Sequence, residues 1–141
     1  MAYRWLPHTA DLKVEITSDS LRGVLEETGT IVRELLVGSS EVGTRVSTAL
    51  TVSGVDAPEL LLAVLRALFD LYHRDRLVPS HVELSDPTQG PEGPSVAGRV
   101  RGEPFDPRRH DAQPEIKAVT RHALSVRQTG GQWIATVVFD V

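Results

Sequence analysis

The sequence contains no cysteine. This absence excludes disulfide bonds, thiolate nucleophiles and zinc or iron–sulfur sites held by cysteine, and it fits a reducing compartment. Apolar runs are short as well: none approaches the roughly 20 residues that span a bilayer, and the N-terminus has no apolar core of a secretory signal. We therefore expect a cytoplasmic protein that does not contact a membrane.

Positive charge is also in short supply. Lysine and arginine total 15 against 19 aspartates and glutamates, which gives a net charge of −4. Binding to nucleic acid by bulk electrostatics needs a basic surface that displaces counterions from phosphates, so the composition argues against that mode. Local basic patches remain compatible with it.

The length and composition are those of an ordinary globular protein. The chain has 141 residues, of which 40% are hydrophobic and 24% are charged. A chain of this size can bury a core without disulfides or metal staples. With no internal repeat and no linker-like stretch, residues 1–141 are expected to form a single domain.

Hydrophobic periodicity in the first half predicts a strand, a helix, a strand and a second helix. Residues 12–17 alternate between apolar and polar. After Ser18-Asp19-Ser20, which offers side chains for an N-terminal cap, apolar residues recur at helical spacing over 21–36. Residues 45–53 alternate again. The segment 56–59 then reads as a capped helix start with a proline in the first turn, and its wide apolar stripe extends to Tyr72.

The second half is predicted to be mostly extended. A short strand at 81–84 precedes 86–94, where repeated proline and glycine predict an irregular, hairpin-like loop. After a returning strand near 95–102, the runs 115–127 and 132–141 form a hairpin across Gly130 and Gly131. This order predicts an α+β domain in two layers, a largely antiparallel sheet with two helices packed on one face.

Familiar catalytic motifs are missing from the sequence. There is no phosphate-binding loop, and no serine is framed by glycines as in a nucleophile elbow. The five histidines lack the spacing of helical zinc motifs. No catalytic residue is predicted.

The last residues bring two carboxylates together. The side chain of Asp140 and the main-chain carboxylate of Val141 follow directly on an alternating, strand-like run. Two anions held this close repel each other unless a cation or strong donor lies between them, which makes the pair a candidate metal ligand.

Four motifs in order along the chain resemble those of the archease family, a small family of RNA-ligase accessory proteins. They are His8-Thr9-Ala10-Asp11, the stretch Gly102 to His110, the segment Glu115 to His122, and the final Phe139-Asp140-Val141. The resemblance spans the whole chain. One departure from the family pattern is Arg121, which stands where an aromatic residue is more typical. This change alters both stacking and charge, and it raises the question of whether this chain presents the family's usual surface to its partner.

The resemblance implies a metal site formed by Asp11, Asp140 and Val141. Because these donors are all oxygen, they suit a hard divalent cation, calcium foremost, with magnesium and manganese as alternatives. The opposing interpretation is that Asp11 merely begins a strand and Asp140 is a solvated strand end.

Five further residues are candidates for contact with phosphate or a partner. Lys117 lies inside a resembled motif and could supply a point charge, although a lysine on an edge strand also discourages edge pairing. His8 and His122 could orient metal-binding carboxylates. Arg108 and Arg109 form a local basic patch whose alternative explanation is a solvated loop.

The function that the resemblance implies is that of an accessory protein, not an enzyme. Such a protein activates an RtcB-type RNA ligase in tRNA splicing or RNA repair by promoting guanylylation of the ligase and multiple turnover. RNA contact is then expected only jointly with the ligase. Two alternatives stay open: a metal-dependent phosphohydrolase or nuclease, and a chaperone-like modulator of a tRNA-modifying methyltransferase.

Overall fold

Two helices and eight strands make up the part of the chain that the computed structural model describes, residues 2–6 and 11–141. In chain order the elements are β1 (Ala2–Leu6), β2 (Leu12–Ser18), α1 (Leu21–Val37), β3 (Val46–Ser53), α2 (Ala57–Asp75), β4 (Leu77–Leu84), β5 (Thr88–Gly90), β6 (Gly93–Pro104), β7 (Ala118–Thr129) and β8 (Gln132–Asp140). None of the described helices is long and apolar enough to cross a bilayer.

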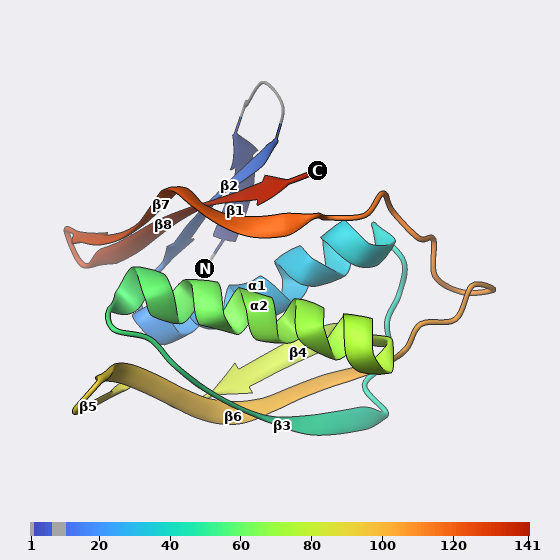
Figure 1. Ribbon diagram of the computed structural model, residues 1–141, viewed down its shortest axis with the longest axis horizontal. Coiled ribbons are helices and arrows are strands. Elements are labelled where there is room, and N and C mark those ends of the chain that lie inside the picture. Colours follow the sequence, from blue (N-terminus) through green and yellow to red (C-terminus); the bar gives the residue numbers. More distant parts are fainter. Residues whose placement is uncertain (1, 7–10) are drawn as a thin grey trace.

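The strands divide between two antiparallel sheets, and the helices lie between them (Figure 1). One sheet has the order β1-β2-β8-β7; the other has the order β3-β6-β4, with the short β5 paired to β6. The α+β class, the antiparallel pairing and the two helices are as predicted. The layer count is corrected: there are three layers, sheet, helices and sheet, where the hydrophobic pattern predicted one sheet with helices on one face.

The helices are buried on more than one side, which explains the third layer. Leu60, Leu61 and Leu62 are consecutive on α2 and all are almost completely buried. Three successive helical residues point in directions about 100° apart, so a single sheet could not cover them. Both helices contact strands of both sheets.

Both helices begin with the caps that the sequence predicted. The hydroxyl of Ser20 accepts a hydrogen bond from the Gly23 N–H at 3.0 Å, and the carboxylate of Asp56 accepts one from the Glu59 N–H at 3.0 Å. Gly38 ends α1 with a φ of +62°, a conformation that favours glycine. The helix α2 runs three residues beyond Tyr72, to Asp75.

Three strands differ from the prediction: β1, the start of β4, and β5. The strand β1 was not predicted, and β4 begins four residues before the expected His81. The segment expected to be irregular contains β5, a three-residue strand. Proline at 87, 91 and 94 limits this strand's length without preventing its pairing with β6, because prolines are tolerated at strand edges and ends.

The hairpin of β7 and β8 is confirmed, with Gly130 and Gly131 both at positive φ. Its register shifts between Thr120 and Ser125, where β7 carries extra residues and Ala123 adopts a φ of +57°. This β-bulge lies within the first half of β7. Bulges of this kind re-aim side chains and bend the strand.

Candidate functional site

Asp11 and Asp140 meet at one end of the sheet formed by β1, β2, β8 and β7. Leu12 pairs with Phe139 in the antiparallel β2–β8 ladder, so the residues just before Leu12 and just after Phe139 lie at the same end of the two strands. Phe139 is fully buried, and side chains alternate along a strand, so Asp140 faces away from the helices and is exposed. Val141 follows it, 45% exposed.

The start of β7 joins the same sheet end. The N–H of Lys117 donates to the carbonyl oxygen of Asp140 at 2.9 Å, and Ala118 pairs with Asp140 in the β7–β8 ladder. Three positions far apart in sequence therefore converge here: Asp11 before β2, Lys117 before β7, and the end of β8. Asp11, Asp140, Val141 and Lys117 are the predicted site residues that this convergence brings together.

The donor chemistry at this sheet end fits a hard cation. Within the described ranges, no group of three or more histidine, cysteine, aspartate or glutamate side chains is arranged to hold a metal ion. A metal held here would thus need main-chain oxygen in addition to the carboxylates of Asp11 and Asp140, and Val141 is the residue placed to supply it. Such an all-oxygen set suits calcium, magnesium or manganese.

The two predicted histidines are not established at this site. His8 lies outside the described residues. His122 is exposed in the β7 bulge, where its N–H donates to the Thr120 hydroxyl at 3.2 Å. It lies in the interval where the register is interrupted, between Thr120, which pairs with Val138, and Ser125, which pairs with Thr136.

Arg109 is engaged elsewhere, with the buried carboxylate of Glu103 at the end of β6. Both terminal nitrogens of Arg109 donate to Glu103, one of them at 3.0 Å, and the N–H of Gly43 donates to the same carboxylate. The side chain of Glu103 is only 2% exposed. The hydrogen bond from Arg109 is the largest cause that lowers the pKa of Glu103 to about 2.

His110 completes this cluster. Its Nδ1 accepts a hydrogen bond from the Asp106 N–H at 2.9 Å, which leaves the proton on Nε2, 3.4 Å from a Glu103 oxygen. Arg108 is exposed, and its N–H donates to the Asp106 carboxylate at 2.9 Å. The cluster belongs to the sheet of β3, β6 and β4, so Arg108 and Arg109 do not join Asp11 and Asp140.

Sequence reasoning missed Glu103 as a partner. The available signal in the sequence was an acid, Glu103, followed six residues later by Arg109, with prolines at 104 and 107 between them. Only the tertiary fold adds the Gly43 N–H, because that residue is 60 positions away.

Arg121, the departure from the family pattern, has a defined partner. Its Nε and Nη2 donate to the two carboxylate oxygens of Glu59, each at 2.9 Å. This paired contact joins the β7 bulge to the first turn of α2, and it lowers the pKa of Glu59. The ion pair gives this arginine a structural role at the position.

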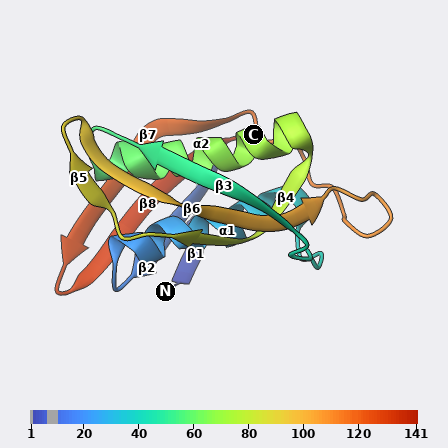
Figure 2. The same ribbon diagram turned by 90° about the horizontal axis from the view of Figure 1, so that it is seen from below.

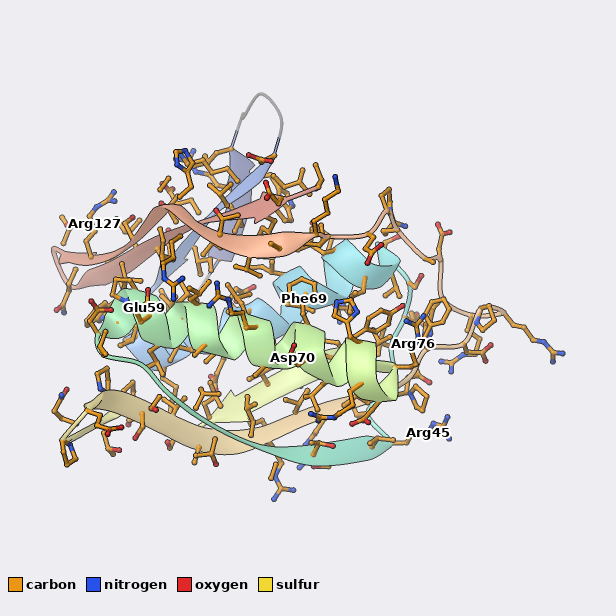
Figure 3. All side chains as sticks on the ribbon, in the orientation of Figure 1. Arg45, Glu59, Phe69, Asp70, Arg76 and Arg127 are labelled. Carbon is orange, nitrogen blue, oxygen red and sulfur yellow. The ribbon has the colours of Figure 1, made fainter. Side chains whose placement is uncertain are left out.

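Two adjoining cavities run between α2 and the segment that leads into β7. Their volumes are about 270 and 300 Å³, and both are lined by Phe69, His73 and Ile116. Arg66, Asp70 and Lys117 line the second cavity, and Figure 3 shows Phe69 and Asp70 on the same side of the molecule. Lys117 thus connects this groove to the sheet end through its N–H bond to Asp140.

Comparison with known proteins gives one consistent family. Residues 3–141 match the Archease protein family (MTH1598/TM1083). The chain is 30% identical over 141 residues to protein archease of Methanopyrus kandleri, covering 100% of both chains, and 28% identical to protein archease of Pyrococcus furiosus, covering 95% of this chain and 94% of that one.

Solved structures agree in fold. The solution structure of Methanobacterium thermoautotrophicum protein 1598 superposes with a TM-score of 0.84 at 22% identity, covering 99% of this chain and 98% of that chain. The crystal structure of an archease, possible chaperone, from Thermotoga maritima gives a TM-score of 0.61 at 20% identity, covering 96% and 94%. The full-length sequence match, supported by this shared fold, means that the chain belongs to the archease family.

Proposed function

We propose that this protein is a metal-binding accessory protein that activates an RtcB-type RNA ligase. In this proposal it promotes guanylylation of the ligase and supports its multiple turnover, and it catalyses no reaction itself. Family membership supports an accessory role. Contact with RNA is made only together with the ligase, in keeping with the net charge of −4.

The observation that carries the proposal is the convergence at the end of the β1-β2-β8-β7 sheet. Asp11 and Asp140 adjoin each other through the β2–β8 register, and Lys117 is tied to Asp140 by a main-chain hydrogen bond. Asp11, Asp140 and a main-chain oxygen of Val141 are the proposed ligands of a divalent hard cation, calcium first. When bound, such a cation supplies positive charge that favours phosphoryl groups nearby.

The chain's own residues then orient and complete the site. The hydrogen bond from Lys117 fixes the main chain at Asp140, and the paired strands hold the two aspartates on a rigid support. The ammonium group of Lys117 is proposed to contact a phosphate or an acidic group of the ligase. His8, His122, Arg108 and Arg109 remain further candidates for such contacts, with Arg109 already paired to Glu103.

The experiment is a ligation time course in which RNA is in molar excess over an RtcB-type ligase. It is run with and without the protein. We expect the wild-type protein to stimulate guanylylation and repeated turnover, and Asp11→Asn or Asp140→Asn to reduce stimulation by roughly tenfold or more, as expected when a metal ligand is lost. The isosteric change removes charge while keeping the side-chain shape.

Asp111→Asn provides the matched control. Asp111 is also exposed, but it lies in the 105–117 connection, where its N–H donates to the Ser40 hydroxyl and its carbonyl oxygen accepts from Gln113, so these hydrogen bonds use its main-chain atoms. This variant should stimulate the ligase normally. If Asp11→Asn stimulated as well as Asp111→Asn, the metal-centred mechanism would be wrong.

A second candidate is a chaperone-like modulator of a tRNA-modifying methyltransferase, with the metal in a structural role. The description of the Thermotoga maritima archease as a possible chaperone favours this alternative. Mixing the purified protein with a tRNA methyltransferase and with the ligase separates the two: stimulation of only the methyltransferase would support the second candidate.

A further inference from the structure

We propose that the groove between α2 and the start of β7 binds an extended peptide segment of a partner protein. The peptide adds to the free edge of β7 and places an apolar and an acidic side chain in the groove. The metal site does not enter into this inference, which concerns the helix-facing side of the same sheet.

The strand β7 offers a free edge. It is the last strand of the order β1-β2-β8-β7, so within the described residues no other strand pairs with its outer side. Figures 1 and 2 show β7 and α2 along the same side of the molecule, with β1 and β2 on the far side. A row of unpaired backbone groups at a sheet edge is the element that an added strand recognises.

The groove beside this edge has an apolar floor. Phe69 is 7% exposed and Val119 is 6% exposed, so both belong to the core, and each contributes to the wall of the second cavity. Ile116 lines both cavities. The combination of a strand edge and an adjacent helix leaves room for one side chain of an added strand to pack against this floor.

The rim selects for negative charge. Arg66 and Lys117 line the second cavity together with a single acid, Asp70. Arg66 is exposed, and no ion pair is found for it among the described residues, in contrast to Arg121, which is bound to Glu59. On a chain with a net charge of −4, a locally cationic rim favours a carboxylate over an ammonium group.

These features determine the spacing of the two side chains along the bound peptide. Side chains two residues apart on a strand face the same side, so an apolar residue and an acid at positions i and i+2 both enter the groove. The intervening side chain faces the outer side of the sheet, away from the groove, so the groove places no requirement on it. The expected ligand is therefore extended, with an apolar residue and an acid separated by one residue.

The test is a two-dimensional NMR titration of the full chain with the acetylated, amidated pentapeptide Thr-Val-Thr-Glu-Thr. We expect shifts in the amides of residues 116–120 and 66–73, and slower hydrogen exchange at 118–120 as the edge becomes paired. The same peptide with lysine in place of glutamate should bind at least roughly threefold more weakly, the scale of an exposed charge contact.

Two arginine variants sharpen the result. Arg66→Glu should weaken binding by roughly threefold to tenfold. Arg127→Glu, the same charge reversal on an exposed residue at the far end of β7, should leave it unchanged. Binding should also be the same in the presence of a metal chelator, so failure of the ligase proposal would not affect this outcome.

The proposal is overturned by any of three results: no shifts in the groove at millimolar peptide, equal binding of the lysine peptide, or shifts without slower exchange at 118–120. The last of these would mean that the peptide meets only the charged rim and does not add to the strand.

Discussion

At the scale of single residues, the most consequential feature is the buried carboxylate of Glu103. It accepts hydrogen bonds from Arg109, from the Gly43 N–H and from His110, so its charge is fully compensated although its side chain is 2% exposed. A buried charge is tolerated only with such partners, and their loss is costly. Glu103 thereby fixes the turn after β6 and the loop that contains Gly43.

Replacement of Glu103 by glutamine should lower the free energy of unfolding by about 2 kcal/mol at neutral pH, because charge-assisted hydrogen bonds become neutral or are lost. Urea unfolding followed by circular dichroism measures this. The control is Glu83→Gln, which removes an exposed carboxylate paired with Arg101 and should cost less than about 1 kcal/mol.

The same carboxylate predicts an acid dependence. The pKa of Glu103 is about 2 in the folded state and 4.5 as its reference value, with the Arg109 hydrogen bond as the largest cause of the shift. The stabilisation from its ionised form is therefore complete above pH 4.5 and is lost as the pH falls towards 2. Glu103→Gln should flatten this part of the stability curve; an equally steep curve in the variant would assign the acid dependence to other groups.

Tyr3 predicts a dependence at the opposite end of the pH scale. Burial, followed by its hydrogen bond to Glu34 at 2.9 Å, raises the pKa of Tyr3 from 10.0 to about 12. The folded state thus favours the protonated phenol, and this stabilisation is present below pH 10 and lost as the pH rises towards 12. Absorbance titration of tyrosinate should show a group ionising near pH 12 that Tyr3→Phe removes. A wild-type titration with every tyrosine ionising near 10 would contradict this.

At the scale of elements, close packing decides how α1 lies on the sheet of β3, β6 and β4. A Cβ atom added at Gly29 would come within 2.8 Å of a methyl group of Val82 on β4, so the glycine permits the approach of helix and strand. Gly29→Ala should therefore destabilise the protein by about 1 kcal/mol, since overpacking outweighs the gain in helix propensity.

The background of Val82→Ala should reverse that sign. Without the valine methyls the nearest neighbours of the added Cβ are the Cβ and the backbone nitrogen of residue 82, each at 3.4 Å and in ordinary van der Waals contact. Alanine in a helix is favoured over glycine by up to about 1 kcal/mol. Thermal unfolding of the two single variants and the double variant measures this. If Gly29→Ala were destabilising by the same amount in both backgrounds, contact with Val82 would not be its cause.

Individual helices and turns could be predicted from the sequence, but the pairing of strands into sheets could not. Helical spacing, the caps at Ser20 and Asp56, and the Gly130-Gly131 turn are local signals, and each predicted its element correctly. The division of strands into two sheets is not local, because a strand's alternation does not name its partner. The run of consecutive leucines from Leu60 to Leu62 was a local sign in the sequence that α2 is covered on two sides, and all three are buried in the structure.

At the scale of the whole molecule, the convergence of Asp11 with Asp140 depends on pairing between the two ends of the chain. The sequence could point to these two residues as site candidates through the family motifs. Their proximity, however, follows from the β2–β8 register, which the structure provides. Glu59, the partner of Arg121, could not be inferred, because 62 residues separate the two and the bulge in β7 directs the arginine towards α2.

The three-layer arrangement places the proposed metal site and the proposed peptide groove in two different regions of the molecule. The outer side of the β1-β2-β8-β7 sheet carries Asp140 at its end, while the cavities lined by Phe69 and Ile116 open between this sheet and α2. Lys117 adjoins both, through its N–H bond to Asp140 and its place in the lining of the second cavity. A partner that contacts one region is therefore positioned close to the other.

The central claim, that Asp11 and Asp140 bind a hard divalent cation, is tested most directly by isothermal titration of calcium into the metal-free protein. We expect one site per chain in the wild-type protein and in Asp111→Asn, and affinity reduced by roughly tenfold or more in Asp11→Asn and in Asp140→Asn. Equal calcium affinity in all four proteins, or no calcium, magnesium or manganese binding by the wild type, would contradict the account.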